Sequence, residues 1–484
     1  MPIKCETTHI DILNDRKKYI TDCYDNIAIE RDRWIEKNKY YYNYVKKVLN
    51  FIVEPQSRVL QIKCETGYFL NAVNPKYGLG IDCSAKMIEI AKNNYPYLDF
   101  EVQDLECIDT TQKFDYILLI NALGDVIDIQ KLLGRIKSIA NFQTRIVIVN
   151  YNYLWQPIIN LATLLKLKMK QPVQNWLSLN DIDNLLFLAG FERIKKTNFI
   201  LFHKYIPFFS YFFNDVVARF PIMQKLCFNH AIVARKNIRR EDYSNYSVSV
   251  IIPCKNERGN ILNAAQRVPE MGKGTEIIFC DDRSEDGTAE EVQKAISQYS
   301  TKNIKLVHGP GINKAKNVWT GFENAQGDIL MVLDADLTVI PEELPYFFEA
   351  IVEGKGEFIN GSRMIYPMQE NAMKSFNVLG NKLFSLLFSY LLEQRIKDTL
   401  CGTKVLWRND YHRIKNYIGY WGGEDAWGDY DLLFGATKLN LKIIDLPVHY
   451  FDRTYGETKM KKIIYNGLKM LRIYLVALKK LKFF

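Results

Sequence analysis

Twice along this sequence, strand-like apolar runs alternate with helical segments, and a charged seam separates the two blocks. The first block extends from about Trp34 to Arg235 and contains apolar runs at Tyr116–Ile120 and Arg145–Val149. The second block begins with the strand-like segment SVSVII and continues the alternation through DILMVLD. Strands that alternate with helices predict mostly parallel sheets covered by helices on both faces. We therefore expect two α/β domains, which suits a chain of 484 residues.

The charged segment between the two blocks, Arg235–Tyr246, determines the predicted domain boundaries. Its sequence, RKNIRREDYSNY, is polar and has no apolar periodicity, which is typical of a linker. The predicted segments are an N-terminal extension (1–33), a first domain (34–235), a linker (236–246), a second domain (247–458) and a basic tail (459–484).

Composition narrows the choice of compartment and partner. The formal net charge of +9 permits an anionic partner such as nucleic acid, acidic lipid or a phosphorylated substrate. The nine cysteines include no CxxC pair and the six histidines are dispersed, which favours reduced thiols in the cytoplasm and argues against a zinc cluster. The polar start of the chain argues against secretion, and no run of 18 apolar residues predicts a spanning helix. We expect a soluble or peripheral protein.

Acidic turns follow three strands of the second block. Glu257 lies in PCKNERGN, Asp282 in DDRSEDGT, and Asp334 and Asp336 in DADLT. In open α/β sheets, ligands bind beyond the carboxyl ends of the strands. An isolated pair of aspartates is usually solvated surface, but three such turns in chain order favour a site. Their hard oxygen ligands suit Mg²⁺ or Mn²⁺ bound together with a diphosphate.

The segment from Tyr246 to Lys459 resembles the family 2 glycosyltransferases of the GT-A fold, especially the polyprenyl-phosphate mannose or glucose synthases. The matching motifs are VIIPCKNE, FCDDRSEDGT, GDILMVLDADLT, INGSRM, KDTLCGTKVL, GDYDLL and RTYGETK. The resemblance implies that Pro253, Glu257 and Asp282 contact the nucleoside, and that Asp334 and Asp336 hold the metal and diphosphate. It places Ser362 and Arg363 by the phosphates of donor or acceptor, and Arg453, Thr458 and Lys459 near the acceptor phosphate. Lys314, which is not part of the family pattern, adds positive charge beside the diphosphate of the nucleotide sugar.

Asp429, in GDYDLL, aligns with the general base of relatives that use hydroxyl acceptors. A carboxylate there removes the proton of the attacking hydroxyl. A lipid phosphate acceptor is already anionic and needs no base, so Asp429 would then orient the acceptor or bind metal. A third interpretation is an acid that caps the following helix. The sequence departs from the family at Arg283, where glycine is usual, and at Lys314 and Lys316 in GINKAKN.

Two segments have the composition of membrane-surface helices. Residues 459–484 contain eight Lys or Arg residues and no acid, with apolar residues near helical spacing. A cationic amphipathic helix lies naturally in an anionic lipid interface. The segment Phe376–Leu392 is also apolar but too short and polar to span a bilayer. The alternative for both is packing on the transferase core. No nucleic-acid motif is present, so we expect no nucleic-acid partner.

The first domain resembles the class I S-adenosylmethionine-dependent methyltransferases through VLQIKCETGYFL, GLGIDCSAKMIEIAKNN, VQDLE and FDYILL. The resemblance implies a cofactor pocket with Gly67 in the turn after the first strand, Asp82 on the ribose and Asp104 near the adenine. Gln61 replaces the usual acid, and Lys63 and Glu65 replace two glycines. Side chains there need room and a backbone conformation that glycine adopts cheaply. This favours a non-catalytic Rossmann-like domain, with an active methyltransferase that modifies the glycan or lipid product as the alternative.

The sequence thus predicts an inverting glycosyltransferase, peripheral on the inner face of the membrane. It would move a sugar from a UDP- or GDP-linked donor to polyprenyl phosphate or a glycan. The residues predicted to act in catalysis are Asp336, Arg363 and Asp429.

Overall fold

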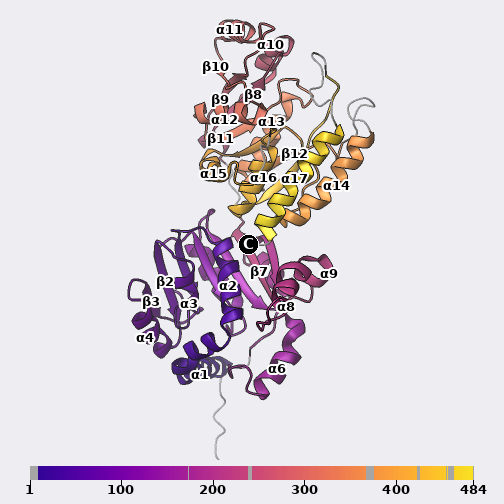
Figure 1. The fold of residues 1–484 in the computed structure, drawn as a ribbon. Helices are drawn as coiled ribbons and strands as arrows, with labels where there is room; N and C mark the ends of the chain where they lie inside the picture. Colours follow the sequence, from indigo (N-terminus) through magenta and orange to yellow (C-terminus); the bar gives the residue numbers. More distant parts are fainter. Residues whose placement is uncertain are drawn as a thin grey trace, which may run out of the picture. The chain divides into compact units, whose positions relative to one another are not determined.

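The computed structural model describes residues 9–172, 174–237, 242–366, 375–421, 426–453, 455 and 463–482. The chain divides between Asn237 and Ile238 into an N-terminal and a C-terminal unit, each built on a seven-stranded sheet with helices on both faces (Figure 1). The predicted α/β class with two sheets is confirmed. Of the predicted linker, residues 238–241 lie outside the described residues, and Tyr243–Asn245 form a short 3-10 turn.

The N-terminal sheet has the strand order β3-β2-β1-β4-β5-β7-β6. Its first five strands are parallel, and β7 runs antiparallel to both β5 and β6. The bounds are β1 Arg58–Ile62, β2 Tyr77–Asp82, β3 Asp99–Val102, β4 Tyr116–Ile120, β5 Arg145–Tyr151, β6 Phe191–Phe199 and β7 Asn229–Lys236. The central strands β1 and β4 are apolar and buried because helices cover both faces.

The helices of this unit include one that the sequence analysis cut in two. The predicted boundary between residues 33 and 34 lies inside α1, a 29-residue helix that packs on α4. The helix bounds are α1 His9–Lys37, α2 Lys39–Ile52, α3 Tyr68–Ala72, α4 Ala85–Asn94, α5 Ile129–Ile139, α6 Gln156–Leu164, α7 Leu179–Leu188, α8 Phe209–Tyr211 and α9 Pro221–Gln224. Short turns are η1 Tyr153–Trp155, η2 Phe212–Val216 and η3 Val217–Arg219.

The C-terminal sheet has the strand order β10-β9-β8-β11-β13-β12-β14. Only β13 is antiparallel to its neighbours β11 and β12. The bounds are β8 Ser247–Cys254, β9 Gly274–Asp281, β10 Asn303–His308, β11 Ile329–Val332, β12 Phe358–Ser362, β13 Lys404–Trp407 and β14 Ile443–Pro447. Since β8 lies between β9 and β11 and all three are parallel, their carboxyl ends meet at one edge.

Helices cover this second sheet. Their bounds are α10 Arg258–Arg267, α11 Thr288–Gln298, α12 Lys314–Asn324, α13 Leu344–Val352, α14 Ser375–Leu392, α15 Arg408–Ile414, α16 Asp429–Lys438 and α17 Ile463–Lys482. The 3-10 turns are η4 Tyr243–Asn245, η5 Pro341–Glu343 and η6 Lys415–Tyr417. In the described part of the chain, none of the helices combines the length and apolarity needed to cross a bilayer.

Candidate active site

The paired aspartates lie where β11 ends, and each carboxylate contacts a cation. Asp334 pairs with the ammonium of Lys314, the first residue of α12. Asp336 is buried, its Oδ1 accepts hydrogen bonds from the Thr338 amide and hydroxyl (3.2 and 2.9 Å), and its Oδ2 lies 2.6 Å from the Arg453 guanidinium. The turn after β11 therefore concentrates negative charge that basic side chains balance.

The pKa of Lys314 depends on the nearby carboxylates of the candidate site. Burial lowers the pKa of its ammonium, but Asp334, Asp429 and Asp336 raise it above its ordinary value. Burial likewise disfavours the charged form of Asp334, yet Lys314 outweighs burial and holds the pKa of that carboxyl below its usual range. Three predicted site carboxylates thus raise the pKa of one ammonium: Asp334 and Asp336 follow β11, and Asp429 begins α16.

A third ion pair, between Arg363 and Asp398, lies at the end of β12. Asp398 is fully buried and accepts hydrogen bonds from Arg363 Nε (2.7 Å) and Nη2 (2.9 Å). Asn381 donates to the same carboxylate at 3.0 Å. The neighbouring Ser362 is also fully buried, and its Oγ has no hydrogen-bond partner among the described residues. Asp398 fixes the direction of the Arg363 guanidinium.

Asp429 is the first residue of α16 and follows Gly428, which has φ +86°. The residue at the N-cap position is Gly428, so the interpretation of Asp429 as the helix cap is wrong. Asp429 Oδ1 lies 3.0 Å from the ammonium of Lys404, which is almost fully buried. This ion pair joins α16 to the start of β13.

The predicted nucleoside contacts lie at the carboxyl ends of β8 and β9. Glu257 is buried and accepts a hydrogen bond from Asn260 at 2.9 Å. Asp282 Oδ1 accepts from the Gly311 amide at 2.7 Å, in the loop that leads into α12. Pro253 lies in β8, in register with Cys280 of β9. Thr458 and Lys459, predicted to approach the acceptor phosphate, lie outside the described residues.

Each of the three acidic turns contains a non-glycine residue in the left-handed region. These are Asn256 (φ +54°), Arg283 (φ +60°) and Leu337 (φ +51°). Arg283 stands where the family usually has glycine, and its backbone takes a conformation that glycine adopts without cost. Strained backbone of this kind clusters at ligand sites, where the surrounding structure holds it in place.

Sequence reasoning missed three residues of the site, all within KDTLCGTKVL. They are Asp398, which holds Arg363, Lys404, which holds Asp429, and Gly402. A Cβ on Gly402 would lie 2.1 Å from a carboxylate oxygen of Asp334, so this position requires glycine. The motif KDTLCGTKVL was recognised in the sequence, but the sequence did not show which residues its charged side chains would pair with.

The aspartates fit a divalent cation shared with phosphates. In the part of the chain that the structure describes, no group of three or more His, Cys, Asp or Glu side chains could hold a metal by itself. Mg²⁺ commonly uses only one or two carboxylates and takes its remaining ligands from water and substrate phosphate. Asp334 and Asp336 supply such a set, and both already bind positive groups.

The corresponding edge of the N-terminal unit is filled by its own side chains. Lys63 (φ +60°) and Glu65 (φ +51°) occupy the turn after β1 in the left-handed region. Lys63 is buried and pairs with Asp125, and Glu65 pairs with Arg31 of α1. Burial raises the pKa of Glu65, but Arg31 outweighs it and the net shift is downward.

Helix α1 runs across this edge and contacts each turn that would meet the cofactor. Lys17 pairs with Asp104 and Glu106, each at 2.7 Å. The Tyr24 hydroxyl donates to Asp125 (2.8 Å), and Asp25 and Asp32 accept hydrogen bonds from the hydroxyls of Ser84 (2.5 Å) and Thr66 (2.6 Å). Because the predicted domain boundary at residue 34 left most of α1 in an extension, this cover was not predicted from the sequence.

The three residues of the predicted cofactor pocket have structural partners. Asp82 accepts the amides of Glu65 and Ser84, both at 2.9 Å, while burial raises its pKa to about 6. Gly67 lies against Phe100, whose ring would be 2.8 Å from an added Cβ. Asp104 is paired with Lys17 but remains 41% exposed, so of the three only Asp82 and Gly67 are enclosed by protein atoms.

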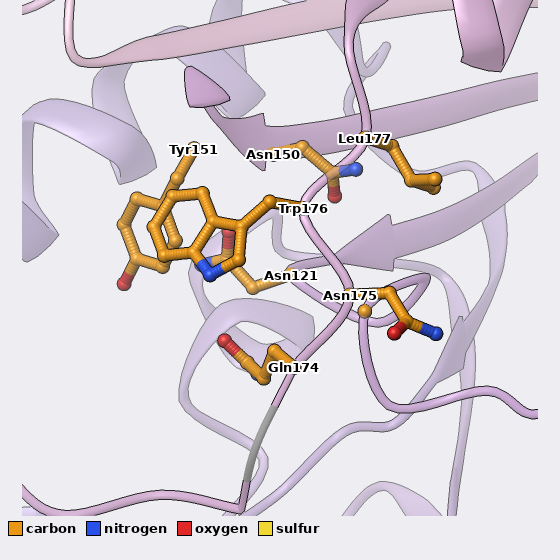
Figure 2. Close-up of a pocket in the computed structure, with 8 residues that line it drawn as sticks. Asn121, Asn150, Tyr151, Gln174, Asn175, Trp176 and Leu177 are labelled. Carbon is orange, nitrogen blue, oxygen red and sulfur yellow. The ribbon is translucent and has the colours of Figure 1, made fainter. Parts of the chain in front are cut away.

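A small hollow remains beyond β4 and β5, lined by Asn121, Asn150, Tyr151 and the segment 174–177 (Figure 2). The Trp176 ring lies beside Tyr151, 6.0 Å between centroids. The hollow measures about 20 Å³, which is room for one water molecule. Because Lys63, Glu65 and side chains of α1 fill the edge where the cofactor would lie, the residues present do not fit S-adenosylmethionine.

The parallel edge of β8, β9 and β11, with its acidic turns, defines the C-terminal unit as a GT-A nucleotide-diphospho-sugar transferase fold. Residues 249–413 match the family model described as glycosyl transferase family 2, and residues 54–189 match the model described as methyltransferase domain. The C-terminal unit thus contains a family 2 glycosyltransferase domain and the N-terminal unit a methyltransferase domain, which confirms both predicted resemblances.

Relatives of known name match the glycosyltransferase half. A dolichol-phosphate mannosyltransferase of Pyrococcus furiosus is 41% identical over 228 residues, covering 46% of this chain and 62% of that protein. An undecaprenyl-phosphate 4-deoxy-4-formamido-L-arabinose transferase of Salmonella paratyphi B is 32% identical over 223 residues, covering 44% and 62%. The chain therefore spans about three fifths of the length of these relatives. A SAM-dependent methyltransferase structure from Thermotoga maritima aligns with a TM-score of 0.36 at 15% identity, covering 45% of this chain and 99% of that one.

The filled edge of the N-terminal unit predicts that S-adenosylmethionine does not bind. Titration of the full chain with the cofactor at up to about 1 mM should give no binding heat in a calorimeter, because Lys63, Glu65 and α1 occupy the edge. A dissociation constant below about 100 μM that Asp82→Asn weakens would contradict this assignment.

Asp398→Asn should destabilise the C-terminal unit by about 3 kcal/mol, because it leaves the Arg363 guanidinium, whose side chain is only 13% exposed, without its counter-charge. Urea unfolding of the two proteins measures the difference. The control is Glu342→Gln, which removes the exposed partner of Arg267 and should cost less than about 1 kcal/mol. Equal losses for the two variants would show that Asp398 has no such role.

Proposed function

We propose that the C-terminal unit transfers a sugar, with inversion, from a nucleotide sugar to a polyprenyl phosphate at a membrane surface. The observation that carries this proposal is a cluster at the carboxyl edge of the sheet, in which Lys314 pairs with Asp334 and Arg453 pairs with Asp336. Asp429 belongs to the same cluster, since it also raises the pKa of Lys314. This cluster pairs carboxylates, which suit a divalent cation, with basic groups, which suit phosphates. The named relatives, both of which carry a polyprenyl phosphate in their names, support the choice of acceptor.

The donor would bind along the edge formed by β8, β9 and β11. Glu257 and Asp282 would accept hydrogen bonds from the nucleoside of a UDP- or GDP-linked sugar. Lys314 and Arg363 would contact the diphosphate, and the buried Ser362 hydroxyl, which has no partner among the described residues, would donate to the same group. Mg²⁺ or Mn²⁺ held by Asp334 and Asp336 would neutralise charge on the departing nucleoside diphosphate.

If the acceptor is anionic, Asp429 is not needed as a base, which agrees with its ion pair with the buried Lys404. A phosphate oxygen forms the new bond to the anomeric carbon, and the old bond breaks with its electron pair leaving on the nucleoside diphosphate. No proton has to be removed from such an acceptor, so Asp429 would hold Lys404 and the N-terminus of α16 in position. Arg453, now paired with Asp336, would attract the acceptor phosphate.

The membrane contact proposed for this unit is the pair of helices α14 and α17. One face of α17 packs inward through Met470, Ile473, Tyr474 and Ala477, which supports the alternative that this helix covers the core. The same helix exposes Leu468 and Leu475 beside basic residues, while α14 exposes Leu383 and Leu386. The rings of Phe388 and Tyr474 join the two helices at 5.9 Å. Core packing and lipid contact therefore use different faces of one helix pair.

Asp336→Ala should reduce transfer at least about 100-fold, since it removes both the proposed metal ligand and the partner of Arg453. The assay supplies Mn²⁺, radiolabelled nucleotide sugars and a host membrane extract, and counts label in the organic phase. Asp242→Ala, an exposed site elsewhere in this unit, is the control and should keep full activity. Substantial transfer by Asp336→Ala would refute the site.

Asp429→Asn separates the two acceptor classes. With a phosphate acceptor, the substitution should lower kcat less than about tenfold, because no proton is transferred. A hydroxyl acceptor needs a base, and its loss should lower kcat about 100-fold or more. In that case the label would appear in water-soluble glycan, and the polyprenyl phosphate proposal would be wrong.

A further inference from the structure

The N-terminal unit bears a large exposed apolar surface that its predicted fold does not require. Two segments form it, 153–170 with η1 and α6, and 204–226 with α8 and α9; we call this surface the apolar ridge. Seven large apolar side chains of the first segment and nine of the second are exposed. Phe208 is 91% exposed, and Leu164 and Ile222 are each 79% exposed. Contiguous patches of this kind mark interaction sites on soluble domains.

The two segments form one surface because they are hydrogen-bonded to each other. The side-chain amide of Asn152, directly before the first segment, donates to the carbonyl oxygen of Lys225 and to that of Cys227, directly after the second segment, both at 2.9 Å. The Trp155 indole donates to the Leu226 carbonyl at 2.9 Å, and its ring contacts Phe228 edge-on at 5.5 Å. The start of the first segment is thereby fixed to the end of the second.

Charge on the ridge has one sign. Exposed lysines accompany the apolar side chains at Lys166, Lys170, Lys204 and Lys225. The first segment contains no acidic residue, and the second contains only Asp215. Asp215 is buried and accepts a hydrogen bond from the Tyr44 hydroxyl at 2.9 Å. The outer surface of the ridge is therefore apolar and cationic.

The apolar and cationic character of the ridge indicates which kind of partner binds to it. In a symmetric dimer through this face, lysines would meet the same lysines of the second copy, and like charges oppose such contacts. An anionic bilayer instead offers phosphates for the lysines and an acyl boundary for Leu, Ile and Phe side chains. Aromatic residues such as Tyr205 and Tyr211, both exposed, suit the headgroup level. The nine-residue α6 is far too short to span a bilayer, so it would lie in the interface.

We propose that the apolar ridge docks the N-terminal unit onto an anionic lipid bilayer. Phe208, Leu164 and Ile222 insert into the acyl boundary, and the four lysines contact lipid phosphates. This contact belongs to a different unit from α14 and α17, and it holds whether or not the transferase proposal is correct. The methyltransferase-like unit would then act as a membrane-docking module.

The first test is sedimentation of the full chain with vesicles of phosphatidylcholine containing about a third phosphatidylglycerol. The ridge variant carries Leu164→Gln, Phe208→Gln and Ile222→Gln, all at exposed positions that leave the core intact. Its matched control carries Ile29→Gln, Tyr97→Gln and Phe187→Gln, equally exposed positions of the same unit outside the ridge. The ridge variant should bind at least about tenfold more weakly while the control binds as the parent does. Equal binding by both variants would overturn the proposal.

The second test identifies what touches the ridge. Phe208 is replaced by the photoreactive p-benzoylphenylalanine in the full chain, and the control chain carries this residue at Tyr97. Irradiation with the anionic vesicles should add the mass of a phospholipid at position 208 and not at position 97. Cross-linking of position 208 to a second copy, or to the C-terminal unit of its own chain, would overturn the proposal. Since neither test measures sugar transfer, failure here is distinguishable from failure of the transferase assay.

Discussion

Balancing negative charge at the carboxyl edge of a parallel sheet is the constraint on which both units of this protein depend. In the C-terminal unit the turns after β8, β9 and β11 bring Glu257, Asp282, Asp334 and Asp336 to one edge. Buried carboxylates are stable only when they are paired or hydrogen-bonded. Lys314 and Arg453 pair with the aspartates, and the amide of Gly311 binds Asp282.

The two units neutralise the carboxylates at this edge with cations from different places. In the C-terminal unit the balancing cations come from loops and helix ends around the edge, and they are groups that phosphates can also bind. In the N-terminal unit the cations are Lys63 of the turn itself and Lys17 and Arg31 of α1, which lies over the turns. The same architecture therefore presents a candidate site in one half and a closed edge in the other. Fold alone does not decide function, because the identity and origin of the side chains at the edge do.

The closed edge also changes how the N-terminal unit contributes to the protein. The buried Asp82, which the methyltransferase resemblance assigned to a ribose, instead accepts hydrogen bonds from backbone amides of neighbouring turns. The distinctive features of this unit lie elsewhere, in the segments 153–170 and 204–226, where large apolar side chains are left at the surface. A domain that serves a lipid-linked reaction by docking needs a surface of this kind and does not need a cofactor.

Much of this protein follows from its sequence. Alternating apolar runs determined two α/β sheets, and the acids after β8, β9 and β11 determined the edge where a site forms, because parallel strands align their carboxyl ends. Local pattern could not assign partners across the chain. The pairs Arg363–Asp398 and Lys404–Asp429 join residues 35 and 25 positions apart, and Arg31–Glu65 joins a helix to a turn 34 positions away. Lone charges in a sequence look alike whether they bind a ligand, cap a helix or neutralise a buried neighbour. Only the tertiary structure decided which role each one has, since ion pairs depend on distance in space, and it alone revealed that α1 covers the cofactor edge.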